Sequence, residues 1–265
     1  MKSFAITIFL AAASPVVAAT LARTYVSTTG ADTNACDRAT PCLSLAAALF
    51  HTSSGGEVDI LDSGDYGPVV ITHPVTVDGG GSLVTTDFVS INSTGSVILR
   101  NFAVASTISE GVIVAGSPSL RVEHVSIGSA PGASLQYGVL CAGGTCSLDD
   151  VLIQNAHNGG SGAAIAVDGA GVKALVTRCT LIGSDIGIVA INGSTVQADR
   201  NLIQSNTVGV TAISNSTVRL SKNTITDNTL GIPPIAPGSS VVSFSNNRIF
   251  GNTTNGNPTV LTTTR

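Results

Sequence analysis

Short alternating groups of hydrophobic and polar residues recur along the chain at a step of about 22 residues. The segment TVQADRNLIQSNTVGV begins at Thr195, a matching segment TVRLSKNTITDNTLGI begins at Thr217, and a third copy covers residues 240–252. Four earlier segments share the pattern, with these inward positions: Ala174, Val176, Cys179, Leu181; Cys146, Leu148, Val151, Ile153; Leu120, Val122, Val125, Ile127; Val97, Leu99, Phe102, Val104. Repeats of this length are typical of solenoids, whose units bury their apolar faces against one another.

Each repeat contains two short alternating strands joined by a two-residue polar turn, then a variable turn and a third apolar strand that starts at Gly or Ala. The expected fold is therefore all-β, a right-handed parallel β-helix over residues 57–252. With coils about 4.8 Å apart, about nine coils would make a rod of roughly 40 Å.

The two ends of the predicted rod differ. Residues 20–56 form an N-terminal segment and cap, in which residues 43–50 (LSLAAALF) predict a short amphipathic helix over the edge of the first coil. Residues 253–265 are rich in Thr, Asn and Gly, and we expect a frayed or loosely draped tail.

One inward column changes character along the rod, from apolar residues to Asn201, Asn223 and Asn247. Stacked asparagine side chains can hydrogen-bond to one another and to the turn backbone. The column therefore predicts an asparagine ladder with a structural role, and a role in binding is the alternative.

Composition supports a strand-rich, exported protein. The 265 residues include 29 Gly, no Trp and only 11% charged residues, which disfavours helical classes and disorder. Lys2, an apolar run and small residues ending at Ala19 predict a signal peptide over residues 1–19 and a secreted or periplasmic location. No later segment is apolar enough to span a membrane. A net charge of −4 without a basic patch argues against nucleic acid as a partner.

The five cysteines fit an oxidising compartment. Cys36 and Cys42 flank a short loop, Cys141 and Cys146 flank a Gly-Gly turn, and Cys179 stands alone. We expect two disulfides and one buried thiol. Metal binding is the weaker alternative for the pairs, because their spacing and the absence of a completing His do not suit a metal site, and no cofactor is indicated.

On these features the chain resembles the pectin-lyase-like superfamily of right-handed parallel β-helices. The resemblance depends on the repeats, on Asn201, Asn223 and Asn247 beside the two-residue turn, and on the opening segments GGEVDIL (55–61) and YGPVVI (66–71), and it covers residues 43–252. It implies a fold rather than an activity, because this architecture hosts lyases, hydrolases, phage tailspikes and non-enzymatic surface proteins.

The resemblance also implies where pectin-degrading relatives carry their acids or calcium ligands, namely on the strand after the variable turn. That strand contains no carboxylate and no basic residue in residues 111–115, 138–142, 164–167, 187–191 and 209–213. Glycoside hydrolysis typically needs two carboxylates, and calcium needs several oxygen ligands.

Charges gather instead on the two-residue turns, where three successive coils carry Glu123, His124, Asp149, Asp150 and Arg178 within about 10 Å. These residues could supply an acid, a base and a charge stabiliser. The alternative is a surface ladder of opposite charges, in which each pair contributes at most about 1 kcal/mol.

The third strand predicts an apolar stripe facing outward, formed by Ile113, Leu140, Ala166, Val189 and Thr211. Such a patch suits self-association or a docked partner, unless residues 155–162 cover it. Two functions remain open: a non-catalytic β-helix that presents its surface to a polysaccharide, a cell surface or a protein, and a polysaccharide lyase or glycoside hydrolase with an atypical site.

Overall fold

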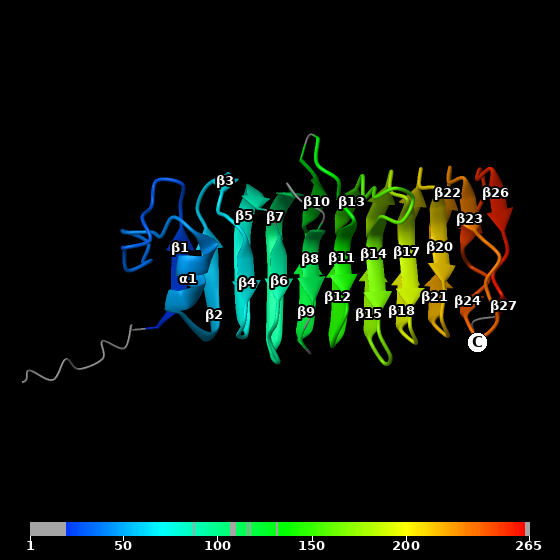
Figure 1. Cartoon of the computed structure of the whole chain (residues 1–265), viewed down its shortest axis with the longest axis horizontal. Helices are drawn as coiled ribbons and strands as arrows, with labels where there is room; N and C mark the ends of the chain where they lie inside the picture. The colour runs from blue at the N-terminus through cyan, green and yellow to red at the C-terminus, as the bar shows by residue number, and fades with distance from the viewer. Residues whose placement is uncertain are drawn as a thin grey trace, which may run out of the picture.

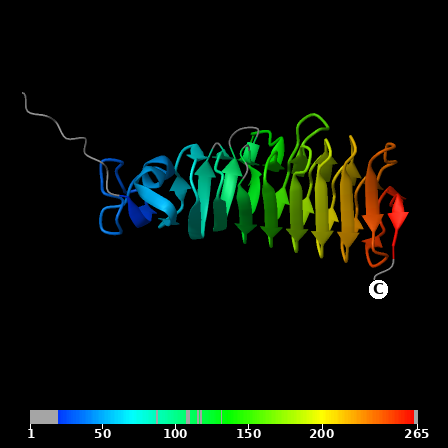
Figure 2. The ribbon, with the colours of Figure 1, turned by 90° about the horizontal axis from the view of Figure 1, so that it is seen from below.

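The computed structural model describes residues 20–86, 88–106, 110–114, 116, 118–130 and 132–262, so the predicted signal peptide lies outside the described residues. These residues form a rod of stacked strands with one short helix at its N-terminal end (Figures 1 and 2). The predicted all-β parallel β-helix is confirmed.

The first and second strands of the coils form one continuous parallel sheet, because β5 and β7 run through the two-residue turn and belong to both. The first strands are β1 (Leu21–Val26), β2 (Thr52–Ile60), β5 (Val75–Thr86), β7 (Ser96–Ser106), β9 (Ser119–Glu123), β12 (Thr145–Asp149), β15 (Lys173–Thr177), β18 (Thr195–Asp199), β21 (Thr217–Ser221), β24 (Ser240–Ser243) and β27 (Val260–Leu261). The second strands are β3 (Gly64–Asp65), the ends of β5 and β7, β10 (Ser126–Ser129), β13 (Leu152–Gln154), β16 (Thr180–Ile182), β19 (Leu202–Gln204), β22 (Thr224–Thr226) and β25 (Arg248–Ile249).

The third strands form a separate parallel sheet in which the described residues supply nine strands. They are β4 (Val69–Ile71), β6 (Val89–Ile91), β8 (Glu110–Val114), β11 (Tyr137–Cys141), β14 (Ala163–Asp168), β17 (Ile186–Ile191), β20 (Val208–Ala212), β23 (Leu230–Ile232) and β26 (Thr254–Gly256).

Strand pairing follows the alignment expected from the repeat. Leu120 pairs with Cys146, Cys146 with Ala174, and Ala174 with Val196, each one coil further along. These side chains are at most 5% exposed and share one core cluster that runs the length of the rod. Apolar burial between neighbouring coils therefore drives the stacking.

The stack extends beyond both predicted boundaries. At the N-terminal end, β1 pairs with β2, so the sheet starts before residue 57. At the C-terminal end, β26 pairs with β23 and β27 pairs with β24, where the loosely draped tail was expected. The Thr259 hydroxyl both accepts from the Val241 N–H at 2.9 Å and donates to the Val241 carbonyl at 3.0 Å, and these bonds hold the polar tail against the last coil.

The capping helix α1 (Leu45–His51) begins two residues later than the predicted segment. Ser44 is its N-cap, because the Ser44 hydroxyl accepts from the Ala47 N–H at 3.1 Å. Leu45, Ala48 and Leu49 are buried in the core of the rod. The helix thus packs its apolar face against the first coils, as the sequence predicts.

Candidate functional site

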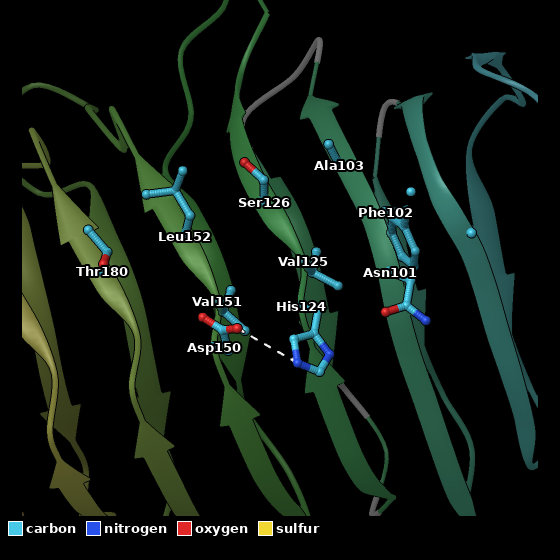
Figure 3. A pocket seen from close by; sticks show the side chains of 12 residues that line it. Asn101, Phe102, Ala103, His124, Val125, Ser126, Asp150, Val151, Leu152 and Thr180 are labelled. Carbon is cyan, nitrogen blue, oxygen red and sulfur yellow. Dashed lines mark ion pairs between the residues drawn. The ribbon is translucent and has the colours of Figure 1, made fainter.

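An open groove of about 730 Å³ follows the two-residue turns across five successive coils (Figure 3). It lies where the first and second strands meet, and its lining consists of Gly80, Gly81, Asn101, Phe102, Ala103, His124, Val125, Ser126, Asp150, Val151, Leu152 and Thr180. Two of the five turn residues singled out by the sequence, His124 and Asp150, lie in this lining.

The backbone of the turn explains which side chains face the groove. Asn101, His124 and Asp150 have φ values of 61°, 51° and 53°. This left-handed conformation bends the chain sharply and suits Asn and Asp better than bulkier residues. The His124 N–H donates to the Asp149 carbonyl at 3.2 Å, so each turn is also fastened to the next coil.

The five predicted turn residues divide into separate pairs. Arg178 bonds to Asp149, and Glu123 forms an ion pair with Arg121 outside the predicted set. Nε2 of His124 lies 3.7 Å from Oδ2 of Asp150, and both side chains are more than half exposed. These are separate surface pairs, and they do not bring the five residues together around one reacting atom.

At its N-terminal end the groove adjoins an ionic network that the sequence analysis missed. Arg100 contacts Asp78 at 2.8 Å and Glu57 at 2.9 Å, and the Asn101 amide donates to Asp78 at 3.0 Å. Arg23 adds bonds to Glu57 at 2.6 Å and to Asp59 at 3.4 Å. The repeat already contained this signal, because the step from Val77 to Leu99 also places Asp78 beside Arg100.

The network affects the acidity of its carboxyl groups. Burial opposes ionisation of Asp78, but hydrogen bonds from the Gly80 N–H, Asn101 and Arg100 outweigh it and lower the pKa of Asp78. Burial raises the pKa of Asp59, and the favourable charge of Arg23 only partly offsets this effect.

The third strands carry few charges, as the sequence indicates. Their observed bounds are slightly wider than predicted, so β8 starts at Glu110 and β14 ends at Asp168. Asp168 accepts a hydrogen bond from the Asn192 amide at 2.8 Å. Within the described residues, no group of His, Cys, Asp or Glu is arranged to hold a metal ion.

The predicted apolar stripe on this sheet is less exposed than expected. Ile113, Leu140 and Thr211 are half-buried, whereas Ala166 is fully buried and Val189 is 3% exposed. Ala166 and Val189 form a small cluster separate from the main core, packed with the half-buried Leu140. Small alanines between larger apolar neighbours leave little accessible surface, so the interpretation as an open stripe requires correction.

The asparagine column forms the expected hydrogen bonds. The Asn201 amide donates to Oδ1 of Asn223 at 2.9 Å, and the Asn223 amide donates to Oδ1 of Asn247 at 3.0 Å. A second ladder, which the sequence analysis did not identify, lies at the end of the second strands and consists of Asn206, Asn228 and Asn252. Its signal was the repeated Asn five residues after each member of the first ladder.

The cysteines lie where the sequence places them. Cys36 with Cys42 and Cys141 with Cys146 are at disulfide-bonding positions, with Cα atoms 4.7 Å and 6.5 Å apart. Cys179 is a free, buried thiol, and burial raises its pKa to about 12. In the described part of the chain, none of the helices has the length and hydropathy of a membrane span.

A comparison with curated proteins finds no match. Among solved structures, a rhamnogalacturonan lyase is similar over 76% of this chain and 73% of its own, with 11% identity and a TM-score of 0.46. Similarity at this level carries no information on activity. The family model described as "Right handed beta helix region" matches residues 87–263, which is well over half of the chain, and the protein therefore belongs to this family of right-handed β-helix proteins.

Proposed function

We propose that this protein is exported and binds a polysaccharide, without cleaving it, in the groove along its two-residue turns. The groove itself is the observation that carries the proposal. It crosses five coils, and coils about 4.8 Å apart make it about 19 Å long, which is a shape suited to an extended chain rather than to a compact ligand. A solenoid offers each unit of a polymer a similar set of contacts.

The lining has the mixed chemistry that sugar rings require. Ser126 and Thr180 present hydroxyl groups beside the apolar side chains of Ala103 and Leu152 (Figure 3). Ligand sites commonly combine apolar surface with a few placed polar groups, because the apolar surface supplies contact and the polar groups fix orientation.

The charges of the groove favour binding over cleavage. Asp150 is the one carboxylate in the described lining, whereas glycoside hydrolysis typically uses two. The neighbouring His124 side chain is 61% exposed and lacks an enclosing wall that would exclude water.

Two features support export. Residues 1–19 have the pattern of a signal peptide, and two cysteine pairs at disulfide-bonding positions suit an oxidising compartment. Self-association through the apolar stripe is not part of the proposal, because Ala166 and Val189 are buried within the single chain.

Affinity gel electrophoresis of the purified protein against a panel of polysaccharides tests the proposal, together with assays for new reducing ends and unsaturated products. We expect retardation without product. Ser126→Tyr should abolish retardation because its ring fills the groove. Ser134→Tyr, the same change at an exposed loop position of the same coil, should not. Products that disappear in Asp150→Asn would favour the lyase or hydrolase alternative.

A further inference from the structure

The cationic groups beside the groove are already paired. Arg178 bonds to Asp149, and Arg100 bonds to Asp78 and Glu57. In the described lining, the charged or titratable side chains are Asp150 and His124, which lie 3.7 Å apart. A ligand in the groove therefore meets a carboxylate and an imidazole, and it meets no arginine or lysine that is free to bind an anion.

We infer that the groove selects a neutral glycan and discriminates against polyanionic chains such as polygalacturonate. This inference rests on the proposed function and adds the class of ligand. Recognition of a polyanion depends on unpaired Arg or Lys side chains that contact its acidic groups. Here an acidic sugar would approach the Asp150 carboxylate, and like charges repel.

The uncharged polar groups of the groove fit hydroxyl groups instead. Ser126 and Thr180 can each donate and accept a hydrogen bond. The Asn101 amide nitrogen is bound to Asp78, so its oxygen is the atom that can accept from a sugar hydroxyl. The exposed Asp150 carboxylate can accept from a sugar hydroxyl in the same way.

The same turn position also explains where the groove ends. Gly80, Asn101, His124 and Asp150 occupy this position in the first four coils of the groove. Arg178 occupies it in the fifth coil, which contributes only Thr180 to the described lining. Further along, Arg200 pairs with Asp199 at 2.7 Å. Long side chains thus replace short ones beyond Asp150, so the open length is restricted to the N-terminal half of the rod.

A matched pair of polymers tests the charge preference directly. Polygalacturonate and its fully methyl-esterified form have the same backbone, and only the first is charged. A neutral galactan serves as a third probe. Isothermal titration calorimetry on the full mature chain should show that at least one neutral probe binds about tenfold more tightly than polygalacturonate, which corresponds to about 1.4 kcal/mol.

A charge reversal in the groove then tests whether Asp150 causes the preference for neutral over acidic polymers. Asp150→Lys should raise affinity for polygalacturonate and narrow the tenfold gap. Asp227→Lys makes the same change of net charge at an exposed position outside the described groove lining, and the gap should persist.

The possible failures are distinct. If the wild type binds polygalacturonate as tightly as the neutral probes, or if Asp150→Lys and Asp227→Lys behave alike, the inference on charge is overturned while glycan binding stands. If none of the three probes nor any polysaccharide of the wider panel binds, the proposed function fails and this inference fails with it.

Discussion

The two halves of the rod share the same two-residue turn, but different residue types occupy the turn and the inward position that follows it. In the N-terminal half, the inward residues after the turn are Phe102, Val125 and Val151, and the outward residues before them are short and line a groove. In the C-terminal half, the inward residues are asparagines and the outward ones include Arg200. The difference separates a half that offers surface to a ligand from a half held by internal hydrogen bonds.

Hydrogen bonding shows what each half gains. Oδ1 of Asn223 accepts from the Asn201 N–H at 2.9 Å, and the Asn223 amide donates to the Ala198 carbonyl at 2.9 Å. The Val151 side chain has no oxygen with which to accept the Val125 N–H, so this turn of the N-terminal half lacks the side-chain connection. They are fastened by apolar packing, by turn backbone bonds and, at the first coils, by the ionic network around Arg100.

The largest expected effect comes from breaking the ladder. Asn223→Leu removes a donor and an acceptor from a fully buried position, so the Asn201 N–H loses its acceptor and the Ala198 carbonyl loses the Asn223 amide. At about 1–3 kcal/mol for an unsatisfied buried group, we expect a loss of about 2 kcal/mol in the free energy of unfolding, measured by urea denaturation. Asn158→Leu in the exposed loop is the control. An unchanged midpoint for Asn223→Leu would mean that solvent replaces the lost bonds.

A smaller effect is expected from Asp78→Asn in the N-terminal half, and its size should depend on pH. Asp78 has a lowered pKa in the folded protein, so its interactions stabilise the fold above the unfolded pKa of about 3.9 and are lost as pH falls through the folded pKa. Asp78→Asn should therefore lower stability by about 1 kcal/mol at pH 7 and by less in acid. Asn223→Leu should have the same effect at both pH values, because the ladder contains no titratable group. If the effect of Asp78→Asn does not change with pH, the charge of Asp78 does not contribute to the stability of the N-terminal half.

The predictability of the two halves differs for a physical reason. The sequence predicts the coils, the inward columns and the first asparagine ladder, because burial imposes one residue class on each position of the repeat. It does not predict the groove, because a concave surface depends on which outward side chains are short and how the left-handed turn residues bend the chain. The burial of Ala166 was missed since alternation gives the direction of a side chain but not the size of its neighbours.

Cys179 lies at the boundary between the halves and can report on both. Its side chain is 1% exposed, and burial raises its pKa to about 12, so the reactive thiolate is scarce. We expect slow alkylation of the native protein and rapid alkylation after denaturation, with Cys36–Cys42 and Cys141–Cys146 linked in the unreduced protein, all measured by mass spectrometry. Rapid labelling of native Cys179 would place local opening at this boundary.

The smallest expected effect comes from a variant, Cys179→Asn, that extends the asparagine ladder by one coil. The Cys179 thiol lies 3.7 Å from the Leu148 carbonyl, where Asn201 places its amide on the Val176 carbonyl at 2.9 Å. Cys179→Asn should therefore donate to the Leu148 carbonyl and offer Oδ1 to the Val151 N–H. Two additional hydrogen bonds, less the strain of a slightly larger side chain, predict a gain of up to about 1 kcal/mol in urea denaturation. Val125→Asn is the contrasting variant, because it places an amide three coils away from Asn201 with Val151 and Cys179 between them. It should destabilise the fold, since a buried amide without its ladder neighbours is left unsatisfied. If both variants lose stability equally, the residue type in the inward column is not the only difference between the two halves. The apolar packing around Val151 would then exclude an asparagine at this boundary.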